Sequence, residues 1–428
     1  MKKLIFVFMI LTICAVNAAA QTSAWIGESE RAKFEELRRS GIEALYNLDY
    51  DKAQQDFKEI TQLYPTHAAG PQLLAARVWI KTLYESRRLQ SSLYSSQNFY
   101  SSGDDKVDPT VINEFRTLTR EAKRLSEVRL KQNPKDIEAL YWLGATEGLK
   151  ASFEEAVERR HFAALKDGDD SVDHHREVLK LDPTFIDANL TAGLYEYVVG
   201  SLPLPIKVVA GVTGFRGSKK KGLALIESVS QNGNWARDDA ATLLIVLYTR
   251  ERRYADALVN ARALSAKYPR NYLFRLEAAD ALVAQAEVER KAMNTEAAVK
   301  AEREAFATFE ELLHDRTVRE TVSRALDLVH FKYGEVLLTA GEGERSAREF
   351  LAATRVEHAE PSLVTMAHLY AARAYDLAGK RAEALAQYRE VLTRPDIYAA
   401  HDEAKRGLTK PYKTESTLPE PPALAGGL

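Results

Sequence analysis

The sequence predicts an all-α protein, an α-solenoid (superhelix) of about six or seven helix pairs. Apolar residues recur at helical spacing along most of the chain, and no stretch alternates between apolar and polar residues as a half-buried strand would. Small residues and prolines also recur at the offsets of a helix–turn–helix unit of about 34 residues. The apolar face of such a unit cannot be buried within it, so successive units must stack.

The clearest first unit spans residues 28–65. Its repeat positions are Leu37, Gly41, Tyr50, Ala53, Phe57 and Pro65. A small residue in each helix lets the two helices approach closely, and the proline ends the second helix. The same offsets recur at 244–269 and 371–395, and in weaker form at 333–361 and after Trp142. A further long helix pair is expected over 271–292 and 295–315.

These units resemble tetratricopeptide repeats (TPR), and the resemblance covers most of residues 30–400. The central stretch GLYEYVVGSLPLPIKVVAGVTGFRGSKKKGLALIE is similar to exported bacterial TPR proteins. It is also similar to a eukaryotic TPR family linked to the mitochondrial outer membrane and lipid droplets. The sequence differs from this family pattern at Ser218 and the three lysines after it, where an acidic residue is expected. It implies a scaffold or adaptor that works near a membrane.

The same central stretch is the candidate interaction segment. Pro203 and Pro205 cannot donate backbone hydrogen bonds, so a helix that enters here must stop. The residues proposed for contact are Leu202, Pro203, Pro205, Phe215, Arg216, Lys219, Lys220 and Lys221. In one interpretation the apolar run 206–212 and the lysines dock on an anionic membrane surface. In the other, which we favour, Val208, Val209 and Val212 fill the space between the two halves of the solenoid and the lysines are solvated.

The first 20 residues have the pattern of a cleaved secretory signal. Lys2 and Lys3 precede an apolar run, 4–16, and three alanines at 18–20 precede an expected cleavage site at Gln21. A retained N-terminal anchor is the alternative. The expected layout is therefore a signal peptide (1–20), an N-terminal TPR-like half (25–195), an irregular connection (196–222), a C-terminal TPR half (223–408) and a disordered tail (409–428). The expected location is the periplasm or cell envelope.

Composition excludes several classes of function. Cys14, the only cysteine, lies in the signal, so the mature chain has no thiol for a disulfide or a thiolate–metal site. The net charge is −2, and it becomes −4 once Lys2 and Lys3 are removed, so electrostatic attraction to nucleic acid is not expected.

No set of catalytic residues is evident, and neither a cofactor nor a metal is expected. The densest polar cluster comprises Asp167, Asp169, Asp170, Asp173, His174 and His175. Its spacing does not fit a calcium loop, and adjacent histidines diverge on a helix. We interpret the aspartates as the N-terminal cap of a helix that starts at Ser171 after a break at 167–170.

The sequence therefore predicts a non-catalytic exported scaffold that binds protein partners in its groove. Binding to a lipid surface through 206–221 is the alternative. A clamp for a partner's C-terminal carboxylate is not expected, because its positions are occupied by Arg38 and Ile42, Thr242 and Val246, and Leu369 and Arg373.

Overall fold

The computed structural model describes residues 25–89, 107–201, 217–315, 322–323 and 325–413. These residues form helices and connecting turns and contain no strand. The α-helices are α1 (Glu28–Tyr46), α2 (Tyr50–Leu63), α3 (Ala69–Glu85), α4 (Pro109–Gln132), α5 (Ile137–Phe153), α6 (His161–Leu181), α7 (Asn189–Ser201), α9 (Lys219–Asn232), α10 (Arg237–Arg250), α11 (Tyr254–Lys267), α12 (Leu273–Lys291), α13 (Thr295–His314), α15 (Leu326–Thr339), α16 (Gly343–Ala353), α17 (Pro361–Leu377), α18 (Arg381–Leu392) and α19 (Ala400–Thr409).

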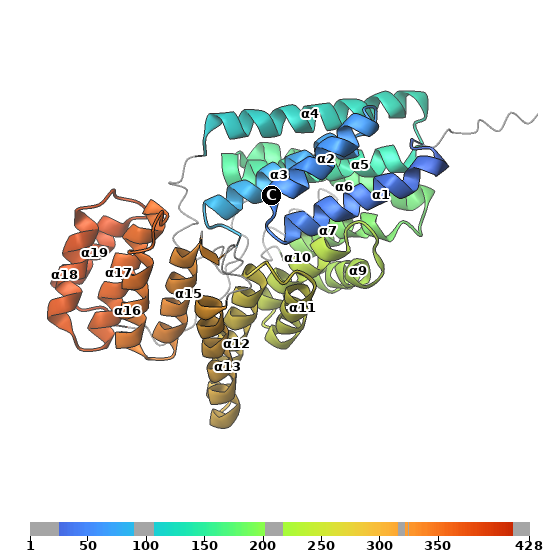
Figure 1. Cartoon of the computed structure of the whole chain (residues 1–428). Coiled ribbons are helices and arrows are strands. Elements are labelled where there is room, and N and C mark those ends of the chain that lie inside the picture. Colours follow the sequence, from blue (N-terminus) through green and yellow to red (C-terminus); the bar gives the residue numbers. More distant parts are fainter. Residues whose placement is uncertain (1–24, 90–106, 202–216, 316–321, 324, 414–428) are drawn as a thin grey trace, which may run out of the picture.

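Consecutive helices pack as pairs, and the pairs stack, which confirms the predicted α-solenoid (Figure 1). The described residues hold eight pairs: α1/α2, α3/α4, α5/α6, α7/α9, α10/α11, α12/α13, α15/α16 and α17/α18. The final helix, α19, packs on α17 and α18. The count exceeds the expected six or seven because α3/α4 and α7/α9 also pair, although their sequences lack the repeat pattern.

The small residues of the repeats pack as predicted. A Cβ atom added to Gly41 would lie 2.3 Å from the Phe57 ring, and one added to Gly334 would lie 2.8 Å from the Phe350 ring. Ala53, at the corresponding position of a second helix, is completely buried. The described structure is therefore TPR-like in its packing as well as in its helix order.

One expected helix boundary is wrong. The break predicted at 167–170 does not occur, because α6 runs without interruption from His161 to Leu181. The chain turns earlier, through a π-helix at Glu154–Glu158 and a left-handed Arg159 with φ of 56°. The turn contains neither glycine nor proline, so no residue in it signals the end of a helix. The aspartates of the polar cluster consequently lie inside a helix and do not cap one.

The ends of the irregular segments also differ from expectation. Helix α7 extends to Ser201 and α9 starts at Lys219, so residues 196–201 and 219–222 are helical. The remainder, 202–216, lies outside the described residues, and the predicted plug at Val208, Val209 and Val212 lies there with it. At the C-terminus, Thr409 ends α19 and the Tyr412 N–H donates to Asp376 Oδ2 at 2.8 Å.

The two halves of the chain contact each other directly. Tyr46, at the end of α1, stacks on Tyr268 with ring centroids 4.8 Å apart. Asn271 Nδ2 donates to the Tyr46 carbonyl at 2.7 Å. Arg87, which follows α3, pairs with Asp327 in α15 at 3.1 Å, and both side chains are buried. The later pairs thus fold back against the first two, and Figure 1 shows α3 ending beside α12 and α15.

Candidate functional site

Most of the predicted interaction segment lies outside the described residues, namely Leu202, Pro203, Pro205, Phe215 and Arg216. The lysines form the first turn of α9, which Ser218 caps by accepting from the Lys221 N–H. Lys219 Nζ pairs with Glu251 at 2.7 Å, and Lys221 Nζ pairs with Glu196 at 2.5 Å. Lys220 is exposed. Because two of the three lysines have acidic partners, little net positive charge is left for an anionic surface. The segment remains a prediction.

The positions considered for a carboxylate clamp do not present free cations. Arg38 is 8% exposed, and its Nε donates to Glu35 at 2.9 Å. Leu369 is completely buried. Arg373 pairs with Glu403 at 2.9 Å and lies between the rings of Tyr370 and Tyr412, at 5.0 and 5.1 Å.

Side chains of α1 nevertheless contact α10 and the turn before it, although these elements are far apart in sequence. The Arg38 guanidinium lies over the Trp235 ring at 5.5 Å, and the Tyr46 hydroxyl donates to Asp239 at 2.5 Å. Thr242 follows Asp239 on α10 by three residues. We call the region bounded by Arg38, Tyr46, Tyr141, Trp235, Asp239 and Thr242 the α1–α10 recess.

Aromatic rings from three connected elements form one wall of this recess. Tyr141 in α5 lies 5.1 Å from Trp235, and Trp142 lies 5.2 Å from it, measured between ring centroids. Phe185 packs on both Tyr141 and Trp235. Asp187 fixes the wall by accepting backbone N–H groups of Asn234, Trp235 and Ala236 at 2.8–2.9 Å, where α10 begins.

Several polar groups of the recess have no partner among the described residues. The buried Nε1 atoms of Trp142 and Trp235 and the buried Oγ1 of Thr242 make no hydrogen bond of normal geometry. The Tyr141 hydroxyl also makes none, although the residue is only 7% exposed. Buried polar groups without partners are uncommon in folded proteins, so their gathering here requires an explanation.

The charge of the recess is negative. Asp239 is exposed to solvent, yet protein atoms surround it closely enough for desolvation to raise its pKa, as a position in a hollow between two helices would. The charges of Asp238 and Asp187 raise the pKa further, whereas Tyr46 and Arg38 lower it. Arg38 already pairs with Glu35, so it balances only part of the negative charge of Asp187, Asp238 and Asp239.

A second charged surface lies on α12, α15 and α17, the first helices of three consecutive pairs, which contact one another. We call it the C-terminal first-helix face. Lys332 is 4% exposed and pairs with Asp280 at 3.3 Å and with Glu335 at 2.7 Å. Burial alone would lower the pKa of Lys332, but the two carboxylates raise it. Burial raises the pKa of Glu335.

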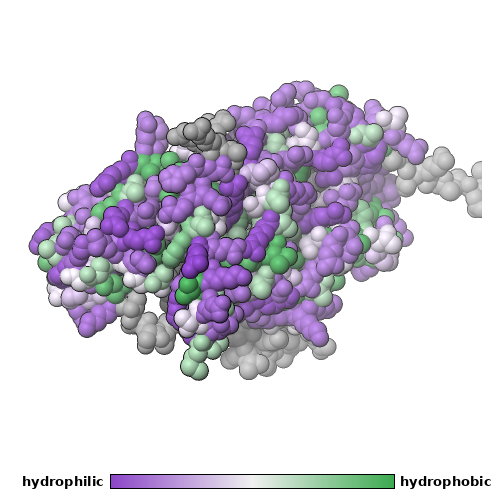
Figure 2. Space-filling model, turned by 60° about the horizontal axis from the view of Figure 1, so that its bottom comes forward, coloured by the Kyte–Doolittle hydropathy of each residue, from purple (hydrophilic) through white to green (hydrophobic). Residues whose placement is uncertain are grey.

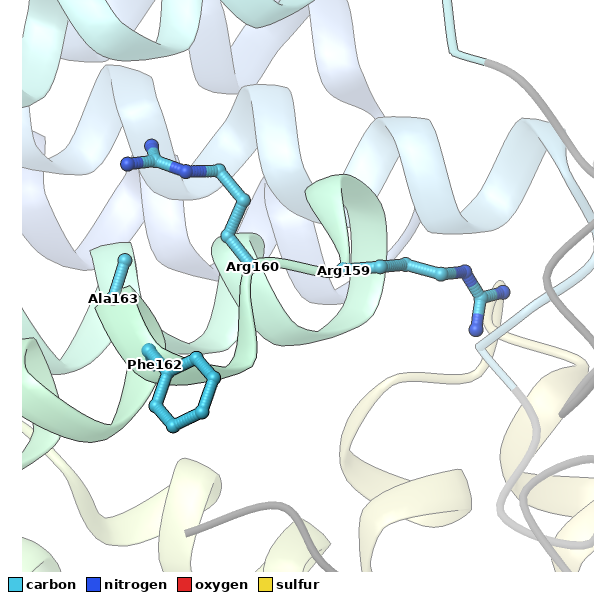
Figure 3. Close-up of a pocket in the computed structure, with 4 residues that line it drawn as sticks. All are labelled: Arg159, Arg160, Phe162 and Ala163. Atoms are coloured by element: carbon cyan, nitrogen blue, oxygen red, sulfur yellow. The ribbon is translucent and has the colours of Figure 1, made fainter.

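A third feature, a shallow surface pocket, lies at the turn between α5 and α6 and is lined by Arg159, Arg160, Phe162 and Ala163 (Figure 3). The two arginines point in opposite directions. Arg160 NH1 pairs with Glu154 at 3.2 Å and with Glu158 at 3.3 Å. Phe162 is 90% exposed. The pocket therefore offers one apolar ring and no convergent polar groups.

His174 and His175, the two histidines of the polar cluster, lie on different sides of α6 and have different partners. His174 Nδ1 lies 2.8 Å from the buried Glu147, which also accepts from Lys123 at 2.9 Å. His175 points the other way and is buried beside the Tyr141 carbonyl at 3.3 Å. Within the described residues no three His, Cys, Asp or Glu side chains are placed to hold a metal ion.

The described helices also include none that is long and apolar enough to cross a membrane. Figure 2 shows one face of the molecule, on which hydrophilic residues predominate and apolar residues form small separate groups. No broad apolar surface is visible on that face.

Comparisons with known proteins give distant structural likeness only. No family model and no curated protein sequence matches the chain. A human IFIT1 dimer with PPP-AAAA is 15% identical, with a TM-score of 0.43, over 90% of this chain and 86% of that one. Yeast Tom70 is 12% identical, with a TM-score of 0.35, over 89% and 96%. With TM-scores this low, the fold and the site rest on the contacts described above.

Proposed function

We propose that this protein is a non-catalytic, exported TPR-like scaffold that binds protein partners in the cell envelope through the first helices of its pairs. The observation that carries the proposal is where the polar groups gather. Unpartnered hydrogen-bonding groups lie on α5 and α10, a partly compensated carboxylate lies on α10, and a cluster of charged side chains lies on α12 and α15. These are first helices, on which solenoid proteins commonly hold an extended or helical peptide.

A further observation supports the proposal. The N-terminal charged and apolar regions supply the basis for export. Mass determination of the protein recovered from its native host tests this part. A mature chain that begins at Gln21 is the expected result, and an intact Met1 would overturn it.

Site-specific photocrosslinking tests the binding surface. A photoreactive amino acid is placed on first helices at Ile42, Val246 and Glu335, and on second helices at Val259 and Val299. The second-helix positions are matched controls, because both valines are exposed, at 65% and 44%. We expect one partner to crosslink from the first-helix positions and not from the controls. Equal crosslinking from both groups, or none from the first helices, would reject the proposed surface.

A further inference from the structure

We infer that the α1–α10 recess binds a cationic nitrogen group, an amine or guanidinium, supplied by a ligand. The inference rests on the proposed function in one respect: it names the chemistry that a partner would present to the first-helix surface. The recess has three properties that together select this chemistry. They are its charge, its aromatic wall and the unpartnered hydroxyl group of Tyr141.

The charge of the recess excludes an anionic ligand. Asp187, Asp238 and Asp239 lie close enough to interact, and the one cation of the recess, Arg38, is bonded to Glu35 at 2.9 Å. Asp187 is further stabilised by three backbone N–H groups, and Asp238 accepts from Tyr268 at 2.5 Å. Among the residues that the structure describes, Asp239 has only the Tyr46 hydroxyl as a hydrogen-bond partner. A ligand cation would supply the charge that this exposed carboxylate lacks.

The aromatic wall favours a cation for a second reason. Ring faces attract a positive group within about 6 Å of the ring centroid, and tryptophan does so most strongly. Arg38 already occupies one such place over Trp235 at 5.5 Å. Tyr141 and Tyr46 add two further rings beside Asp239, and the pKa of Tyr141 is raised first by burial and then by Asp187 and Asp239. Tyr46 and Tyr141 thus place aromatic rings beside the Asp239 carboxylate.

The Tyr141 hydroxyl provides a hydrogen bond that such a ligand needs. It has free acceptor positions, and an ammonium group brings three donors with no acceptor. Tyr141 is more than nine-tenths buried, and its hydroxyl has no protein partner, so a ligand would satisfy a group that folding left unpaired.

The test uses the mature chain and two probes that differ in the terminal ammonium group. The first is Nα-acetyl-lysine N-methylamide, and the second is its norleucine equivalent, which has the same four side-chain carbons and lacks the ammonium group. Binding is followed by tryptophan fluorescence, because Trp142 and Trp235 line the recess. We expect the lysine probe to bind at least tenfold more tightly than the norleucine probe. Equal affinities, or no binding of either probe, would overturn the inference.

Two variants locate the site. Asp239→Asn keeps the acceptor for Tyr46 and removes the charge, and should weaken the lysine probe at least tenfold. Asp238→Asn is the matched control, because Asp238 is engaged by Tyr268 and Lys267, and should change affinity less than twofold. An equal loss in both variants would place the effect outside the recess. If Asp239→Asn fails to fold, the affinities of the lysine and norleucine probes for the unaltered chain still test whether the chain binds a cation.

A third probe separates two sources of the cation. Butylammonium carries the lysine side chain without the peptide groups. Tighter binding of the lysine probe assigns the recess to a peptide, and tighter binding of butylammonium assigns it to a free amine. A crosslinked partner together with failure of the cationic probes would defeat only this inference. Binding of the probes without any crosslinked partner would defeat only the scaffold function.

Discussion

At the scale of single residues, small side chains set the distance between paired helices. Gly41 faces Phe57, which is completely buried and cannot move aside. The glycine is therefore required for close approach of α1 and α2, even though it is a weak helix former.

Gly41→Ala is expected to destabilise the protein by about 1–3 kcal/mol through overpacking. The new Cβ would lie 2.3 Å from the Phe57 ring, and this clash outweighs the better helix propensity of alanine, worth about 1 kcal/mol. Urea unfolding measures the change. Gly168→Ala, also inside a helix, is the control, because its Cβ would meet only the Ala151 side chain at 3.9 Å. Equal stability of the two variants would contradict the packing argument.

A second residue, His175, makes stability depend on pH. Burial lowers the pKa of His175 to about 4, whereas an unfolded histidine has a pKa near 6.5. A lowered folded pKa means that the stabilising contribution is complete above about pH 6.5 and is lost as the pH falls towards 4. The imidazole must stay neutral against Tyr141 and Gly144, so acid favours the unfolded chain.

His175→Gln should therefore flatten the loss of unfolding free energy between pH 6.5 and 4, by an amount on the order of 3 kcal/mol. Urea midpoints at several pH values measure it. His358→Gln serves as the control, because the His358 side chain is 90% exposed. An unchanged acid dependence in His175→Gln would show that other groups dominate in this range.

At the scale of elements, the π-helix between α5 and α6 concentrates charge. Arg88 donates to the Ala156 carbonyl, and Arg116 pairs with Glu158 at 2.8 Å. Glu154, buried beside Asp167, keeps Oε2 without a hydrogen bond. Burial first, and then the charge of Asp167, raise the pKa of Glu154 to about 7. Irregular turns of this kind recur at functional positions, and here the turn also forms the pocket of Figure 3.

Glu154→Gln is expected to stabilise the protein above pH 7 and to have little effect below pH 4.5. A raised folded pKa means that the contribution of Glu154 is complete below about pH 4.5 and is lost as the pH rises through 7. Thermal unfolding at pH 4.5, 6 and 8 tests the sign. Glu155→Gln, the neighbouring change, should not reproduce the trend. A destabilised Glu154→Gln at pH 8 would refute it.

At the scale of the whole molecule, the solenoid is held closed by contacts between residues about 240 positions apart. Arg87 and Asp327 are both buried, and Asp327 also accepts from the Glu360 backbone N–H at 2.9 Å. Such a pair adds little compared with apolar packing, but loss of one partner leaves an uncompensated buried charge.

Asp327→Asn should therefore cost about 3–5 kcal/mol of unfolding free energy. Hydrogen exchange should rise at the end of α3 and at the start of α15, because these elements meet there. Glu36→Gln removes the exposed pair with Lys33 and should cost less than about 1 kcal/mol. If both changes had similar small effects, the contact between the halves would not stabilise the closed arrangement.

The sequence by itself determined the helical pairs and their packing positions. Gly41, Ala53, Phe57 and Gly334 follow the period that any helical hairpin needs, and the structure uses each of them as expected. The start of α4 likewise depends on short-range chemistry, because Asp108 caps the helix and Pro109 is its first residue. These features depend on neighbours in the sequence, which is why a pattern reveals them.

Tertiary structure alone decided the turn at Arg159 and the composition of the α1–α10 recess. The left-handed conformation of Arg159 has no signal in the sequence. The aspartates at 167–170 are typical of a helix cap, and only the packing of α6 places them inside a helix. Arg38, Tyr141 and Asp239 lie up to about 200 residues apart, and only the superhelical path brings them together. Their spacing along the chain carries no information about that path, because the path is set by the summed angles between successive pairs.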